Sequence, residues 1–123
     1  MRTIVPLLLL LAMTACASTG ERSRRDRDRI TLEEIEAADQ TTAFDIIRVL
    51  RPRWLQTRGP SSIYSEDPIM VYVDGNRLGG PETLSTIPKI SIQEMRHLSP
   101  VDAQARYGLN HTNGAILVTT RRG

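Results

Sequence analysis

The sequence predicts an α+β fold, in which a mixed β-sheet of few strands and several short helices form one small domain. The chain has 123 residues, which is enough for one domain with a single hydrophobic core. Two apolar runs rich in β-branched residues, at 68–73 and 115–120, are typical of buried strands. Other segments place apolar residues at helical spacing behind capping residues, which indicates helices.

The composition excludes several classes of protein. Hydrophobic residues make up 40% of the chain, charged residues make up 24%, and the formal net charge is +2, which is unlike a disordered tail or a polytopic membrane protein. A single cysteine leaves no intrachain disulfide and no cysteine-based zinc site. With one Trp, one Phe and three Tyr, the chain is poor in aromatic residues that stack on single-stranded nucleic acid, so no nucleic-acid partner is expected.

Residues 1–15 have the organisation of an export signal. Arg2 precedes an uncharged run, 4–12, which is too short to span a bilayer because a spanning helix takes about 20 residues. The segment Met13-Thr14-Ala15-Cys16 resembles the lipobox of bacterial lipoproteins, with Met where Leu is usual. The resemblance implies cleavage before Cys16 and acylation of its sulfur and new amino group. The alternative is an ordinary signal peptide with an accidental cysteine.

Residues 16–29 are expected to form the lipidated cysteine and a flexible, disordered tether. After Ala17 this segment has no apolar residue and a dense run of charges, 21–29, so it cannot bury surface. Its arginines could also attract anionic lipid headgroups or an acidic partner. Ala17 stands where Asp retains well-studied Gram-negative lipoproteins in the inner membrane. We therefore expect the mature protein at the periplasmic face of the outer membrane, with the lipid anchor as its membrane contact.

The folded part is expected to cover residues 30–123 and to begin with two helices. Thr31 and Glu34 form a capping box pattern at the start of the first helix. The second helix is expected to start at Thr41 or Thr42 and to end before Pro52, because the residue before a proline disfavours the helical conformation. Residues 53–62 are expected to form a loop.

Strands and turns follow in alternation. The first strand precedes the dipeptide Asp74-Gly75, which is a strong turn signal. A short helical turn is expected at 82–87 and a second strand at 92–98. Pro100 suits the first turn of a helix that runs to Tyr107 with Ser99 as its N-cap, and Gly108 suits its C-terminal cap.

A polar turn is expected over 109–114, and its last residue, Gly114, leads directly into the last strand. We therefore place Gly114 with Asp74, Gly75, Pro100 and Gly108 as residues with a structural role in turns.

The segment from Asp67 to the end of the sequence resembles the plug domain of TonB-dependent outer-membrane transporters, most closely the SusC/RagA-like branch. The resemblance is carried by four segments in order: Val73-Asp74-Gly75, then 92–98, then Tyr107-Gly108, and then the run 113–121, Asn-Gly-Ala-Ile-Leu-Val-Thr-Thr-Arg. In these transporters a barrel follows the plug, whereas this sequence ends where the barrel would begin. The resemblance therefore implies a plug-like domain but not transport.

These observations predict a non-enzymatic interaction module. The resemblance implies a TonB-dependent barrel transporter, or a TonB-type energising complex, as the partner. An alternative is a periplasmic lipoprotein that binds a small ligand through the loop 75–86, since transporter plugs contribute loops to substrate recognition.

Few residues of the sequence are candidates for catalysis or metal binding. His97 and His111 are fourteen positions apart and lack the spacing of metal ligands or of a general base with its partner. The carboxylates Glu66-Asp67 and Asp74 stand beside a strand and in a turn, where acidic residues are common for structural reasons. A hydrolase would need a nucleophile with a base in hydrogen-bond reach, and the sequence offers none. No catalytic residue, cofactor or metal is expected.

Cys16→Ser tests the anchor. The substitution leaves the apolar run for export but removes the sulfur that accepts the lipid. Cleavage removes Arg2, so the mature net charge falls from +2 to about +1. At about 1 kcal/mol per basic residue near an anionic surface, this charge is too small to hold the protein. We expect the variant to be recovered as soluble or uncleaved protein, whereas the wild type should partition into detergent and incorporate radioactive palmitate. Unlabelled wild-type protein in the soluble periplasmic fraction would contradict the lipoprotein prediction.

Overall fold

A computed structural model describes residues 27–57 and 68–122. The expected signal peptide, Cys16 and the tether up to residue 26 lie outside the described residues. The strands are β1 Arg29–Ile30, β2 Met70–Val73, β3 Asn76–Gly79, β4 Ile92–Leu98 and β5 Ala115–Thr120. The helices are α2 Leu32–Ala37, α3 Ala43–Leu50 and α4 Pro100–Tyr107, with 3₁₀ turns η1 Pro52–Leu55, η2 Pro81–Thr86 and η3 Lys89–Ser91.

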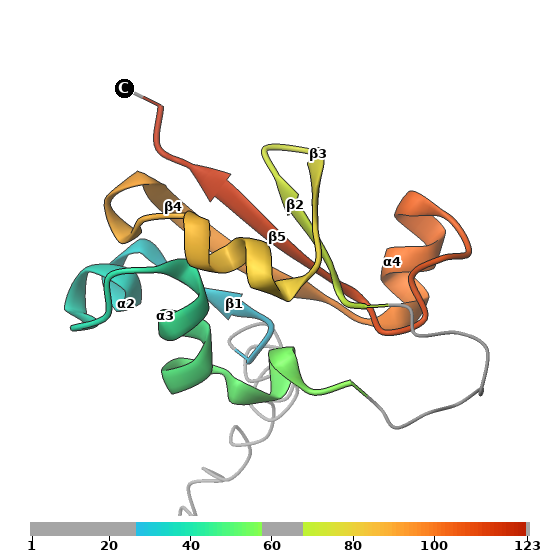
Figure 1. Ribbon diagram of the computed structural model, residues 1–123, viewed down its shortest axis with the longest axis horizontal. Coiled ribbons are helices and arrows are strands. Elements are labelled where there is room, and N and C mark those ends of the chain that lie inside the picture. The colour runs from blue at the N-terminus through green and yellow to red at the C-terminus, as the bar shows by residue number, and fades with distance from the viewer. Residues whose placement is uncertain (1–26, 58–67, 123) are drawn as a thin grey trace, which may run out of the picture.

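The strands form one mixed sheet in the order β1-β4-β5-β2-β3 (Figure 1). The central strand, β5, is antiparallel to β4 and parallel to β2, while β1 and β3 pair antiparallel at the two edges. Figure 1 shows α2 and α3 near one end of the sheet and α4 at the other. The predicted α+β class, with a mixed sheet and short helices, is confirmed.

The first two helices begin at the threonines that the sequence predicts. Thr31 donates its backbone N–H to Glu34 Oε2 (2.9 Å), and Oγ1 of Thr42 accepts the N–H of Asp45 (3.3 Å). Arg51, just after α3, contacts Glu34 through Nη2 and Oε1 at 2.8 Å. Burial raises the pKa of Glu34, but the hydrogen bonds from Thr31 and Arg51 outweigh this effect and hold the pKa below its ordinary value.

The fold includes three residues that the sequence assigned to the tether. Arg29 begins β1 and pairs with β4. The carbonyl of Asp28 accepts the N–H of His97 (2.9 Å), and the carbonyl of Arg27 accepts the indole N–H of Trp54 (3.0 Å). These contacts use backbone groups, which every residue carries, so the side-chain pattern of a charged segment gives no sign of them.

Two further elements differ from the expectation. Residues 52–55 form η1 rather than a loop, because Pro52 suits the first position of a helical turn and Trp54 then becomes buried. After the turn at 74–75 the chain returns as β3, and η2 follows at the position of the expected helical turn, with Leu84 buried. The segment 75–86 is therefore a strand and a helical turn, not a loop.

The main hydrophobic core lies between one face of the sheet and the helices α2 and α3 with η1 and η2. Alternation along β5 directs Ile116 and Val118 into this core, whereas Ala115 and Leu117 reach the opposite face. The buried members of the main core are Ile30, Ile35, Ala43, Ile46, Ile47, Trp54, Ile69, Val71, Leu84, Ile87, Ile92, Met95, Ile116 and Val118.

The opposite face carries a second, smaller core under α4. This helix begins at Pro100, with Ser99 Oγ accepting the N–H of Asp102 (3.2 Å), and ends at Gly108, whose φ is 103°. The expected bounds and caps of this helix are confirmed. The buried members of the second core are Met70, Tyr72, Ala103 and Ala115.

Two glycines with nearly equal backbone torsions have different surroundings. Gly75 has φ 85° in the β2–β3 turn, beside Asp74 with φ 49°, and a Cβ added there would meet nothing within 4 Å. Gly114 has φ 86° at the entry to β5, where a Cβ would overlap the carbonyl oxygen of Leu98 in the neighbouring strand. Of these two positions, Gly75 requires glycine for its positive φ alone. Gly114 requires it for its positive φ and also because there is no space for a side chain.

The pair Gly114→Ala and Gly75→Ala separates these two effects. Positive φ costs an alanine about 1–2 kcal/mol at either position. Gly114→Ala must also displace the backbone of Leu98, so we expect it to lower the free energy of unfolding by about 1–3 kcal/mol more than Gly75→Ala does. Chemical denaturation of both variants measures the difference. Equal losses would show that β4 and β5 do not approach as closely as described.

Candidate functional site

Within residues 27–57 and 68–122, the helix α4 packs on one end of the sheet face that lies opposite the main core. Beyond α4, this face presents three exposed arginines, one each from β1, β4 and β3, and we call Arg29, Arg96 and Arg77 the arginine row. Arg29 lies directly opposite Arg96, and Arg77 lies opposite Tyr72. Because directly opposed residues in antiparallel strands share a face, all three guanidinium groups lie on the side of the sheet away from the main core.

One carboxylate lies within the arginine row. Glu94, two positions before Arg96 in β4, contacts Arg29 (Nε–Oε1, 3.0 Å) and also accepts from Nε of Arg96. It thereby bridges two like charges that would otherwise repel each other across the strand pair. The arginine side chains keep 46% (Arg29) and 56% (Arg96) of their surface exposed, so these ion pairs leave about half of each side chain open to solvent.

Under α4, a buried histidine joins two tyrosines. The rings of Tyr72 and Tyr107 stack with centroids 3.9 Å apart. His111 is 4% exposed, with Nδ1 2.9 Å from the carbonyl of Gly108 and Nε2 2.7 Å from the hydroxyl of Tyr72. A carbonyl can only accept, so Nδ1 donates to Gly108, and in the neutral ring Nε2 accepts from the hydroxyl of Tyr72. The sequence placed His111 in a polar surface turn, but both ring nitrogens have a structural role here.

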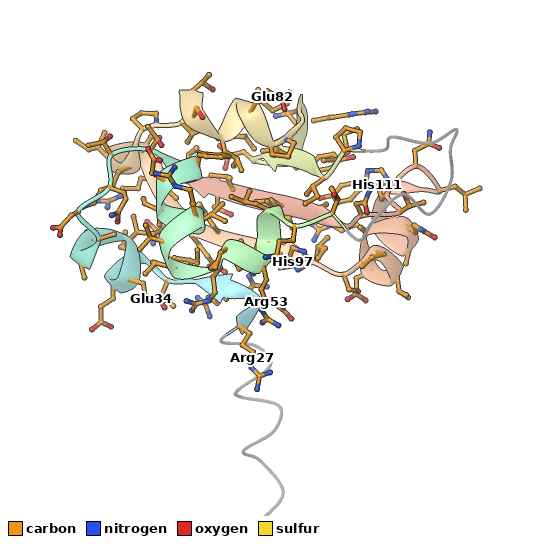
Figure 2. All side chains as sticks on the ribbon, turned by 60° about the horizontal axis from the view of Figure 1, so that its bottom comes forward. Arg27, Glu34, Arg53, Glu82, His97 and His111 are labelled. Atoms are coloured by element: carbon orange, nitrogen blue, oxygen red, sulfur yellow. The ribbon has the colours of Figure 1, made fainter. Side chains whose placement is uncertain are left out.

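A hollow of about 670 Å³ lies at the end of the domain where the described chain begins. Figure 2 shows His97 and Arg53 together there, with Arg27 nearby and His111 farther along beside α4. Polar and charged side chains from four separate segments dominate the lining, which consists of Arg27, Asp28, Arg53, Trp54, Gln56, Thr57, His97, Ser99, Pro100, Thr112 and Asn113.

His97 is the residue in the lining of this hollow whose pKa departs from its ordinary value. Its ring stacks on Trp54 with centroids 5.7 Å apart, and its Nδ1 is 3.8 Å from Asp28 Oδ1. Burial lowers the pKa of His97, the Asp28 carboxylate offsets this only in part, and the charge of Arg53 lowers the pKa further. The imidazole is therefore held below its ordinary pKa of about 6.5.

Asp74 connects the β2–β3 turn to the central strand. Its carboxylate accepts the backbone N–H of Thr120 (2.9 Å) and the hydroxyl of the same residue. The two hydrogen bonds from Thr120, that of the side chain first, lower the pKa of Asp74. The structural role that the sequence assigns to Asp74 is thus supported by a long-range contact as well as by the turn.

The structure also places the remaining candidate residues. Residues 66–67 and Cys16 lie outside the described part of the chain. The hollow is not lined by any residue of 75–86, so it gives no support to ligand binding by that segment. Among residues 27–57 and 68–122, no group of three or more His, Cys, Asp and Glu side chains could hold a metal ion, and no helix is long and apolar enough to cross a membrane.

Comparisons of the chain with protein-family models, with curated proteins and with solved structures find no match. The resemblance to transporter plugs therefore stays a prediction that depends on the four segments named above.

The surroundings of His97 predict a pH dependence of stability. The unfolded chain binds a proton on this imidazole near pH 6.5, whereas the folded chain binds it only at lower pH. Stabilisation by neutral His97 is thus complete above about pH 6.5 and is lost as the pH falls from there toward the folded pKa.

His97→Phe keeps a ring against Trp54 but cannot titrate. Chemical denaturation at steps between pH 7.5 and 5 should show the free energy of unfolding falling more steeply for the wild type than for the variant. His111 is present in both proteins, so the difference between the two curves isolates His97. Parallel curves would contradict this environment for the imidazole.

Proposed function

We propose that the protein is a non-enzymatic, lipid-anchored module with a plug-like domain, which is held at the periplasmic face of the outer membrane and associates with envelope transport components. The partner that the resemblance implies is a TonB-dependent barrel transporter or a TonB-type energising complex. The observation that carries the proposal is the polar hollow at the end of the domain, which offers a concave surface suited to a protein loop.

The arrangement of the plug-like segments supports a domain that stands by itself. The turn 73–75 is hydrogen-bonded to Thr120 at the end of β5, and the segment 92–98 is the strand that pairs with β5 on its other side. Tyr107-Gly108 closes α4, and 113–121 contains β5 itself. The four segments thus contribute neighbouring parts of one sheet domain, whose cores need no surrounding barrel to cover them.

The lining of the hollow favours a protein partner over a small apolar molecule. Small-molecule pockets are lined mainly by apolar and aromatic side chains with a few polar groups. Here the one large aromatic residue, Trp54, is 2% exposed, and it is occupied by its contacts with His97 and with the carbonyl of Arg27. Apart from Pro100, the other lining residues are polar or charged, as in the rim of a protein–protein interface.

The serine hydroxyl in the lining of the hollow is used in a helix cap. Ser99 lines the hollow with His97, but its Oγ donates to Asp102 Oδ2 at 2.8 Å and caps α4. A nucleophilic serine needs its hydroxyl directed to a base. This arrangement supports a binding role for the hollow rather than a hydrolytic one.

Crosslinking in native outer membranes, followed by affinity purification, tests the proposal. The control is a protein in which residues 1–29 anchor an unrelated domain. We expect the wild type to enrich a TonB-dependent transporter or a TonB-type component. Arg53→Glu, which reverses a charge at the hollow, should lower that enrichment several-fold.

The matched control is Arg48→Glu, which reverses the charge of an exposed residue on α3 outside the hollow. This variant should leave the enrichment unchanged. If no envelope protein is enriched over the anchored control, the interaction proposal is wrong. If Arg53→Glu and Arg48→Glu behave alike, the hollow is not the contact surface.

A further inference from the structure

The arginine row extends across the whole width of the sheet. Arg29 is opposite Arg96, Arg96 is opposite Leu117, Leu117 is beside Tyr72, and Tyr72 is opposite Arg77. Four spacings of about 4.8 Å between strands separate the two ends by roughly 19 Å. The row therefore presents guanidinium groups at both ends of a broad surface, with the half-buried Leu117 between them.

The positive charges of the arginine row contribute little to the stability of the fold. Directly opposed like charges, as in Arg29 and Arg96, destabilise a strand pair. Glu94 compensates one of them, but ion pairs at this degree of exposure contribute little to stability. Three arginines and one glutamate leave about two net positive charges on this face. A planar guanidinium group suits phosphate, which it can bind through two parallel hydrogen bonds.

The position of Arg29 at the start of the domain indicates what the arginine row contacts. Arg29 belongs to the row and is also the first residue of β1. It follows Cys16 by thirteen residues, which reach at most about 45 Å when fully extended. A lipid on Cys16 would therefore keep the row close to the membrane surface, whereas a soluble acidic protein gains no such proximity.

We propose that the arginine row docks on the phosphate groups of anionic lipids in the membrane that holds the anchor, and that this contact orients the domain. The inference rests on the lipid anchor of the proposed function. At about 1 kcal/mol per net positive charge, the row favours the docked orientation roughly 30-fold. That preference is too small to retain an unanchored protein but sufficient to orient an anchored one.

The opposite side of the domain is suited to face away from the membrane. The helix α2 packs its buried Ile35 into the main core and exposes Glu33 and Glu36. Glu36 is paired with Nη2 of Arg121 (3.2 Å), whereas Glu33 adds negative charge that anionic headgroups would repel. Docking through the arginine row therefore avoids the repulsion that the reverse orientation would produce.

The test uses the mature acylated protein in vesicles of phosphatidylcholine alone or with 30% phosphatidylglycerol. Thr119→Cys, on β5 next to the row, receives an environment-sensitive fluorophore, and lipids with spin-labelled headgroups act as quenchers. We expect several-fold stronger quenching in the anionic vesicles and its loss in 0.5 M salt, which screens exposed charges. The same probe at Glu33→Cys should show no increase.

Two variants assign the effect to the row. Arg77→Gln combined with Arg96→Gln should remove the extra quenching of the Thr119 probe, whereas Arg48→Gln should keep it. Circular dichroism checks that both variants keep the wild-type fold.

The outcomes separate this inference from the proposed function. Equal quenching in both kinds of vesicle, with the protein still floating with neutral vesicles, would overturn the docking inference and leave the anchor intact. Failure to float with neutral vesicles would contradict the anchor itself. If a polyglutamate peptide, but not phosphatidylglycerol, changes the Thr119 probe, an acidic protein segment occupies the row and the lipid assignment is wrong.

Discussion

The pairing of β5 with its two neighbours is the constraint on which the rest of the domain depends. This strand is hydrogen-bonded to β4 on one side and to β2 on the other, so it fixes the register of both. It can enter the sheet only because Gly114 lets its backbone pass the carbonyl of Leu98. At its other end, Thr120 holds the β2–β3 turn through Asp74. Displacement of β5 would therefore disturb both cores and separate the arginines of the row.

The two faces of the sheet have different roles because the helices are distributed unequally. One face is closed by α2, α3 and the 3₁₀ turns, and it buries the main core. The other face is covered at one end by α4, where Tyr107 stacks on Tyr72 and His111 completes the polar contacts. Among the described residues, the remainder of that face carries the arginine row with Glu94, and the half-buried Leu117 lies between the ends of the row. The domain thus has one face that buries the main core and a second face that combines a smaller core with charge that folding does not require.

The polar hollow is built by the contacts that hold the start of the described chain on the domain. The carbonyls of Arg27 and Asp28 are tied to Trp54 and His97, which fixes the start of the domain against β4 and η1. This arrangement partly buries the imidazole of His97, which lowers its pKa. The carboxylate of Asp28 raises the pKa, but it offsets only part of the effect of burial. The same contacts that join residues 27 and 28 to the fold therefore position the charged groups around the hollow.

The sequence alone determined the local elements and the predicted export signal. Thr31, Thr42 and Ser99 cap helices by contacts within three residues, and Asp74-Gly75 and Gly108 meet local torsional requirements, so short patterns suffice to predict them. Tertiary structure alone decided that His111 is buried, that residues 27–29 join the fold, and that the hollow assembles from four segments. Arg29, Arg77 and Arg96 form a row only because long-range strand pairing sets their register. Which residues a sheet brings side by side depends on pairings between segments distant in the chain, and no local pattern contains that information.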